Sequence, residues 1–283
     1  MNSQEIINIF QQASRANVEN INRFGNVIKL NGPGKVVVSG DVHGHDRNFE
    51  RLVCTAAMDS DVNNHLIAHE LIHCNEPVSA TMCHSYKLLL EAAMLKIRYP
   101  NQFHFLMGNH AMAQITQDEV LKNGQPMVRS FNAGIEDVFG SDAKAVYEAM
   151  QVFLMTLPIA CRTNNKIWMS HSLPAMRNLA AFDSSIFDEP ITLDVLKNNR
   201  SLRALIWDRR HCSDCVEQLQ QMWDIEAFVV GHQPQVHGCC KLQKGLIVIA
   251  SDHNHGCFLE FQLDFDYKAD DLFALVKPLA SIA

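Results

Sequence analysis

Short apolar runs and longer amphipathic stretches alternate along this chain, which predicts an α/β fold. The apolar runs have the length of buried strands, and polar or glycine-containing segments separate them. They cover residues 36–39, 65–68, 102–107, 157–162, 166–170, 204–207, 226–230, 246–250 and 258–263. Apolar residues at helical spacing predict helices over residues 4–24, 49–56, 79–98 and 143–157, and the polar interval 118–129 predicts a loop and a short helix.

The first predicted helix precedes the turn-forming segment Asn31-Gly32-Pro33-Gly34, which indicates a linker. We therefore expect an N-terminal helical extension and linker over residues 1–34 and a single globular domain over residues 35–283. A chain of 283 residues with 47% hydrophobic content can bury a sizeable core. No oligomeric state follows from the pattern, although the N-terminal helix would suit an interface.

The charge distribution argues against nucleic acid or an anionic membrane as a partner. The formal net charge is −7, and the sequence has no run rich in Lys and Arg, whereas both partners require clustered positive charge. No apolar run approaches the roughly 20 residues needed to cross a bilayer, and the N-terminal residues lack the pattern of a secretory signal. We expect a soluble, cytoplasmic protein.

The nine cysteines suit reduced thiols better than a disulfide framework, because the number is odd and a chain of this size does not need covalent cross-links. Cys212 and Cys215 form a C-x-x-C pair, and Cys239 and Cys240 follow. A structural zinc site is conceivable there, but the second pair lacks the matching spacing.

Residues 35–47, KVVVSGDVHGHDR, place two candidate metal ligands at the end of a predicted strand. The strand runs into Gly40, and Asp41 and His43 follow two positions apart. Gly40 and Gly44 allow the backbone torsions and close approach that such a turn needs. A carboxylate oxygen beside an imidazole nitrogen suits a divalent transition metal.

The same arrangement recurs, because five strand-like runs end in a candidate ligand or acid-base residue. In open α/β sheets, sites form where loops leave the carboxyl ends of strands, so residues far apart in the chain can converge there. The candidates are Asp41, His43, Glu70, Asn109, His110, His171 and His232.

Four blocks of sequence resemble, in chain order, the motifs of the calcineurin-like metallophosphoesterases, and most closely those of their phosphoprotein phosphatase branch. The blocks are GDVHG at 40–44, GNH at 108–110, His171 with Leu173-Pro174, and VVGHQP at 229–234. The similarity runs from about Lys35 to Phe261. It implies a central β-sandwich of mixed sheets flanked by helices, in αββα layers.

The resemblance also implies a chemistry, namely hydrolysis of a phosphate monoester on a protein or a small molecule by a metal-activated hydroxide. Asp41 and His43 would bind one divalent metal, and Asn109, His171 and His232 mainly the other, with His110 as the acid that protonates the leaving oxygen. The metals would be manganese, iron or zinc. Two adjacent metals can stabilise both the attacking and the leaving oxygen of an in-line displacement.

One block departs from the family. Where the family reads Gly-Asp-x-Val-Asp-Arg-Gly, this chain reads HELIHCN at residues 69–75. Glu70 replaces the bridging aspartate and, with one more methylene, could still bridge the metals. His73 replaces the aspartate that orients the acid histidine, and could become a metal ligand instead. Cys74 replaces the arginine that binds phosphate.

The family places another arginine in the region after the 204–207 run, where this chain has Arg209 and Arg210. We expect one of them to bind the phosphate of the substrate. Their alternative role is that of exposed surface charges.

Two other functions compete with phosphoester hydrolysis. Residues 69–73 match H-E-x-x-H, which on a helix forms the zinc site of a metalloprotease, although no helical pattern surrounds them here. The changes at Glu70, His73 and Cys74 also suit a catalytically weak or inactive relative that binds a partner.

Overall fold

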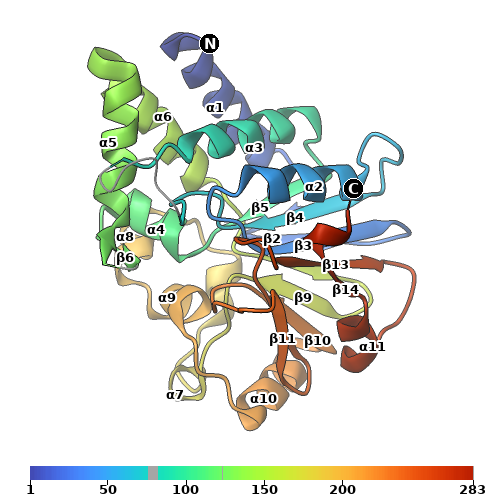
Figure 1. Ribbon diagram of the computed structural model, residues 1–283. Coiled ribbons are helices and arrows are strands. Elements are labelled where there is room, and N and C mark those ends of the chain that lie inside the picture. Colours follow the sequence, from blue (N-terminus) through green and yellow to red (C-terminus); the bar gives the residue numbers. More distant parts are fainter. Residues whose placement is uncertain (76–81, 123, 283) are drawn as a thin grey trace.

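The computed structural model describes residues 1–75, 82–122 and 124–282, and its centre is a pair of stacked β-sheets (Figure 1). The larger sheet has the order β1-β2-β8-β9-β10-β12-β11, and the smaller has the order β14-β13-β3-β4-β5. The larger sheet comprises β1 (Arg23–Phe24), β2 (Val27–Leu30), β8 (Ala160–Thr163), β9 (Ile167–Ser170), β10 (Ala227–Val230), β12 (Leu246–Ile249) and β11 (Cys239–Gln243). The smaller comprises β14 (Val276–Pro278), β13 (Cys257–Gln262), β3 (Lys35–Asp41), β4 (His65–His69) and β5 (Phe103–Leu106). A separate hairpin joins β6 (Leu121–Lys122) to β7 (Gln125–Pro126).

Successive side chains of each strand point alternately to the two faces of its sheet, which explains why the core has two layers. In β3, Val36 and Val38 join a cluster between the sheets, whereas Val37 joins the cluster on the helix side. In β9, Met169 faces the other sheet and Trp168 faces outward. Because successive side chains of a strand point to opposite faces, a strand buried on both faces is apolar throughout.

Helices cover the outer faces of both sheets (Figure 1). Those packed around the smaller sheet include α1 (Ser3–Val18), α2 (Asp46–Ala56), α3 (Tyr86–Arg98), α4 (Asn109–Thr116), α5 (Met127–Phe139) and α6 (Ala143–Met155). The others are α7 (Met176–Leu179), α8 (Leu193–Asn198), α9 (Arg200–Trp207), α10 (Ser213–Trp223) and α11 (Ala269–Ala274). Trp223 of α10 packs on Trp168 and Phe228 of the larger sheet, with ring centroids 4.7 and 6.0 Å apart. This architecture confirms the predicted mixed α/β sandwich flanked by helices.

Most predicted strands are present, but the run 204–207 is not a strand. It forms the end of α9, whose buried face carries Leu202, Leu205 and Ile206 at helical spacing. Four apolar residues were too few to show the period. The first helix ends at Val18 rather than at residue 24, and Ile21 is exposed. Residues 79–81 of the third predicted helix lie outside the described residues.

The sequence pattern missed several elements. The strand β2, within the segment predicted as extension and linker, lies in the larger sheet between β1 and β8. The interval predicted as a loop and short helix contains the hairpin β6–β7 and leads into the 13-residue helix α5. Helix α10 was also unpredicted.

Parallel pairing brings the carboxyl ends of the central strands to one edge. In the smaller sheet β3, β4 and β5 are parallel, and in the larger sheet β9, β10 and β12 are parallel. A bridge between Asp41 and Ala250 connects the two sheets at this edge. The loops that leave both sheets therefore meet there.

Within residues 1–75, 82–122 and 124–282, no helix combines the length and apolar character needed to span a membrane.

A buried histidine pair makes the fold sensitive to acid. His104 Nε2 lies 3.4 Å from His65 Nδ1 between β4 and β5, and burial lowers the pKa of His65 to about 4. In the unfolded chain the ring takes up a proton near pH 6.5. The free energy of unfolding therefore falls as the pH drops from about 7 toward 4, since the unfolded state binds more protons.

We expect His65→Asn to reduce this loss of stability between pH 7.5 and 4.5 by roughly 2 kcal/mol. Urea unfolding of the metal-free protein at both pH values measures it. The control is His237→Asn, because His237 is exposed and its ring is solvated in both states. Equal pH dependence of His65→Asn and the unmodified protein would contradict the expectation.

Candidate active site

Five strand ends deliver the candidate residues to one place. Strand β3 leads to Asp41 and His43, β4 to Glu70 and His73, β5 to Asn109 and His110, β9 to His171, and β10 to His232. All eight side chains are buried. The structure therefore brings together every histidine, carboxylate and amide predicted from the strand ends.

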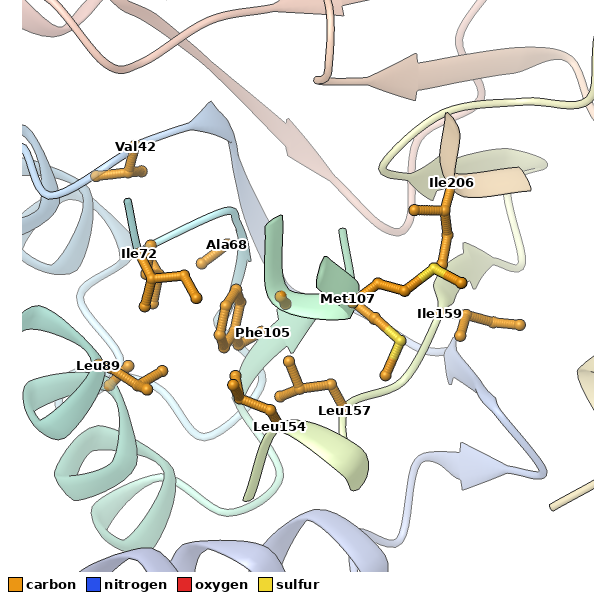
Figure 2. Close-up of a cluster of buried hydrophobic side chains, with 14 of the residues drawn as sticks. Val42, Ala68, Ile72, Leu89, Phe105, Met107, Leu154, Leu157, Ile159 and Ile206 are labelled. Carbon is orange, nitrogen blue, oxygen red and sulfur yellow. The ribbon is translucent and has the colours of Figure 1, made fainter. Parts of the chain in front are cut away.

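Apolar neighbours anchor the polar residues of each loop. Val42 separates Asp41 from His43, and Ile72 lies between Glu70 and His73. Figure 2 shows Val42 and Ile72 among buried side chains that also include Leu89 and Phe105. Burying the apolar residues holds the backbone of each loop, which fixes the positions of the polar side chains beside them.

Backbone hydrogen bonds join the first two loops. The amides of Val42 and His43 both donate to the Glu70 carbonyl, at 3.0 and 2.7 Å, and Gly44 donates to the Leu71 carbonyl at 3.0 Å. Among the described residues, eight non-glycine residues have positive φ, and half of them are His43, Glu70, His73 and His232. Such backbone strain concentrates at functional sites, where the surrounding structure must hold it.

Two glycines permit the close approach of the side chains. A Cβ on Gly108 would collide with Glu70 Oε1, and it would lie 2.8 Å from His171 Nδ1. A Cβ on Gly231 would collide with Asp41 Oδ1. The glycines in the two motifs therefore make room for the carboxylates.

Three candidate ligand atoms lie within 3 Å of one another. His171 Nε2 is 2.7 Å from Asn109 Oδ1 and 2.9 Å from His232 Nδ1, and the last two atoms are 3.0 Å apart. Burial lowers the pKa of His232 to about 2, so its ring is neutral at physiological pH. A neutral imidazole is the form that binds a metal.

The spacing of these atoms fits one transition metal ion. Ligand atoms about 2.1 Å from a metal and at right angles to one another, as in octahedral coordination, lie about 3 Å apart. In the described part of the chain, no three His, Cys, Asp or Glu side chains are placed to bind one ion together. The amide oxygen of Asn109 completes the set with the two imidazoles.

The two carboxylates beside these ligands differ in charge. Burial raises the pKa of a carboxyl, but His171, His43 and His232 outweigh it and hold the pKa of Asp41 well below its ordinary value. Burial, together with the charge of Asp41, raises the pKa of Glu70 to about 7. Glu70 Oε2 has no hydrogen-bond partner among the described residues, and the nearest polar neighbour of Asp41 Oδ1 is His171 Nδ1, 3.4 Å away, whose pKa the charge of Asp41 helps to raise against the effect of burial. Buried oxygens without a donor suit a cation.

His73 contacts His110 as part of a polar chain. Gln114 donates through Nε2 to Asn132 Oδ1 at 2.7 Å and to the Tyr147 hydroxyl at 3.1 Å, so its Oε1 accepts from His73 Nε2 at 2.8 Å. His73 Nδ1 is then the acceptor for His110 Nδ1 at 2.8 Å. The other nitrogen of a neutral His110 ring, Nε2, carries no proton.

Both rings of this pair are held neutral. Burial lowers the pKa of His73 to about 3 and the pKa of His110 well below its ordinary value. A carboxylate at position 73 would stabilise the protonated form of His110, and His73 cannot do so.

Cys74, at the position where the resemblance implies an arginine, interacts with a second thiol. Its Sγ lies 2.9 Å from Cys83 Sγ, which is 3.0 Å from the Ser85 hydroxyl. The same serine hydroxyl accepts a hydrogen bond from the His73 amide at 2.9 Å. This position therefore supplies no cation to the site.

A cavity of about 220 Å³ opens over the candidate ligands. Both Arg209 and Arg210 are exposed, but only Arg209 lines the cavity, and its Nε donates to His232 Nε2 at 2.9 Å. Lys122 and Asp252 also line the cavity, and neither was among the residues predicted from the sequence. Asp252 lies two residues after the predicted strand run 246–250, and this strand-end position was a signal that could have identified it. Lys122 lies in the interval predicted beside the site, but nothing in the sequence singled it out.

The H-E-x-x-H match does not form a helical zinc site. His69 ends β4, and residues 70–75 are not helical. His69 Nδ1 is bonded to the Ser39 carbonyl at 2.8 Å, whereas His73 faces His110 and Gln114. The two histidines therefore do not share one helix face, which rules out the protease arrangement.

Comparisons with solved structures show the fold. A protein serine/threonine phosphatase from Saccharomyces cerevisiae, described as similar to human phosphatase PP5, matches with a TM-score of 0.70 and 14% identity, over 99% of this chain and 94% of that one. A cold-active protein-tyrosine phosphatase from a Shewanella species matches with a TM-score of 0.55 and 15% identity, over 82% of this chain and 76% of that one. No protein-family model and no curated protein matches the sequence. The chain thus has the fold of these two phosphatases.

The polar chain predicts the tautomer of His110. In the metal-free protein at neutral pH, we expect a long-range ¹H–¹⁵N spectrum to show its proton on Nδ1, assigned by His110→Asn. Gln114→Leu removes the acceptor for His73 Nε2 and should leave His110 in a mixture of tautomers.

Gln151→Leu is the matched control, since Gln151 also contacts the Tyr147 hydroxyl but does not contact His73. A His110 ring protonated on Nε2 in the unmodified protein would contradict the assignment.

Proposed function

We propose that this protein is a metal-dependent phosphatase that hydrolyses a phosphate monoester on a protein or a small molecule. The observation that carries the proposal is the cluster of Asn109 Oδ1, His171 Nε2 and His232 Nδ1, mutually within 3 Å at the strand ends. Asp41 and Glu70 lie beside the cluster, and His110 follows Asn109 directly. The fold shared with two phosphatases supports the same conclusion.

Two divalent cations, manganese, iron or zinc, would be held by this set. Asp41 and His43 would bind one, Asn109, His171 and His232 the other, and Glu70 would lie between them. When bound, such ions polarise phosphoryl oxygens and lower the pKa of water toward neutrality. Burial lowers the pKa of His43 to about 4, so at neutral pH no proton competes with a metal for the ring nitrogen.

His232 links the ligand set to Arg209. Its Nε2 lies 3.1 Å from the Trp207 carbonyl and 2.9 Å from Arg209 Nε. If Nδ1 binds a cation, the ring proton resides on Nε2 and donates to Trp207, since a neutral imidazole has one N–H. Nε2 would then not accept from Arg209, and the guanidinium would be available to bind the phosphate.

His110 lines the cavity beside these residues and is the candidate to assist the leaving oxygen. In the neutral ring its proton is on Nδ1, bound to His73, so Nε2 must first gain a proton. Catalysis by His110 as an acid is therefore weaker than with a carboxylate at position 73.

The neutral His73 beside His110 also favours a second candidate function. The protein would then be a binding protein that has the fold and the metals but little activity. Two tightly bound metals without turnover of any phosphate monoester would favour it.

The first test joins metal content to activity. We expect the purified protein to bind divalent metal and to hydrolyse p-nitrophenyl phosphate with added manganese. His171→Gln and Asn109→Ala should each lower metal content, measured by inductively coupled plasma mass spectrometry, and reduce turnover at least about 100-fold. His255→Asn is the control, because His255 is exposed. Full turnover by His171→Gln would count against the proposed ligand set.

The second test uses the leaving group. With weak proton donation by His110, p-nitrophenyl phosphate should react about 100-fold faster than phenyl phosphate, because p-nitrophenolate leaves without protonation. His73→Asp gives His110 a carboxylate partner and should narrow this ratio, whereas His73→Asn, without the charge, should not. Equal rates for the two esters in the unmodified protein would exclude this role of His73.

A further inference from the structure

The cavity over the candidate ligands has cationic side chains from two elements. Arg209 follows α9, and Lys122 belongs to β6 of the hairpin that leads into α5. Asp41 and Asp252 also line the cavity. An anionic substrate must overcome the field of these carboxylates, so each cation at the cavity affects its binding.

The ammonium of Lys122 is only loosely paired. Its Nζ lies 3.7 Å from Asp252 Oδ2, and that oxygen already accepts from Asn75 Nδ2 at 2.8 Å. Among the described residues, no acceptor lies within hydrogen-bond distance of Nζ, and the side chain is 23% exposed. A partly desolvated ammonium with three donors is thus directed at a cavity and has unused capacity for hydrogen bonds.

The hairpin that carries Lys122 is firmly attached. Glu119 accepts hydrogen bonds from the amides of Val120, Val128 and Arg129, at 3.1, 2.9 and 3.3 Å. The amide of Met127 donates to the Val120 carbonyl at 2.9 Å. Glu119 therefore ties the base of the hairpin to the first turn of α5, which positions Lys122 at the cavity.

Lys122 also lies near the candidate metal ligands. Burial is the largest cause of the lowered pKa of His43, and the positive charge of Lys122 is the second largest. It reaches the same cavity as His110 and Asn109. The hairpin thus places a cation near the site, whereas position 74 holds a thiol.

We propose that Lys122 binds the phosphoryl oxygens of the substrate, in the role that the resemblance assigns to an arginine at position 74. The inference rests on the proposed function, since it names a substrate contact of that site. A lysine ammonium is a compact point charge, so it contributes attraction and up to three hydrogen bonds but no planar bidentate contact. Arg209 remains the residue capable of that contact.

Titration calorimetry of the metal-loaded protein with orthophosphate tests the proposal. We expect Lys122→Gln to weaken phosphate binding about tenfold, in line with loss of a charged hydrogen bond, and to raise KM for p-nitrophenyl phosphate more than it lowers kcat. Lys122→Arg should stay within about threefold of the unmodified protein. Lys144→Gln, which removes an equal charge at an exposed position on α6, should change neither quantity.

Asp252→Asn separates substrate binding from a structural ion pair. If Lys122 only pairs with Asp252, Lys122→Gln and Asp252→Asn lose similar thermal stability and Lys122→Gln leaves the phosphate affinity unchanged, which would overturn the proposal. Failure of the unmodified, metal-loaded protein to bind phosphate would overturn it as well. If that protein binds phosphate through Lys122 but hydrolyses no ester, the phosphatase proposal fails and the Lys122 contact stands.

Discussion

Burial of charged and polar groups at one edge of the sandwich is the constraint on which the site depends. Glu70 Oε2 is buried without a hydrogen-bond partner among the described residues, and Asp41 Oδ1 has His171 Nδ1 as its nearest polar neighbour, 3.4 Å away. A buried polar atom without a partner costs about 1–3 kcal/mol. The large apolar core on both faces of the sheets offsets this cost, and it holds the loops through residues such as Val42 and Ile72. Buried carboxylate oxygens with so few hydrogen-bond donors are suited to binding a cation.

Residues 69–75 differ from the motif that the sequence resembles, and the structure shows which neighbours accommodate His73 and Cys74. His73 is accommodated because Gln114 Oε1 accepts a hydrogen bond from its Nε2, and because Asn132 of α5 and Tyr147 of α6 orient the Gln114 amide. Cys74 is accommodated by the thiol of Cys83. Compared with the motif that the sequence resembles, positions 73 and 74 have neither the negative charge of an aspartate nor the positive charge of an arginine. Lys122, from a different element, adds a cation at the same cavity.

The fold does not by itself choose a function for this protein. Its two phosphatase neighbours are described as acting on different residues, serine or threonine in one and tyrosine in the other, and each is about 15% identical to this chain. Fold alone does not fix chemistry. The arrangement of His110, His73 and the cations around the cavity therefore distinguishes this protein more than its architecture does.

The sequence alone determined the α/β class, most of the strands and seven polar residues at their ends. Apolar runs and strand-end motifs are local features, and parallel strands carry their loops to one edge. Tertiary structure alone decided that 204–207 ends a helix, because a run of four apolar residues has no readable period. It also decided the partners of His73 and the position of Lys122. Those depend on contacts between segments distant in the chain, such as Gln114 with His73 and Lys122 with Asp252.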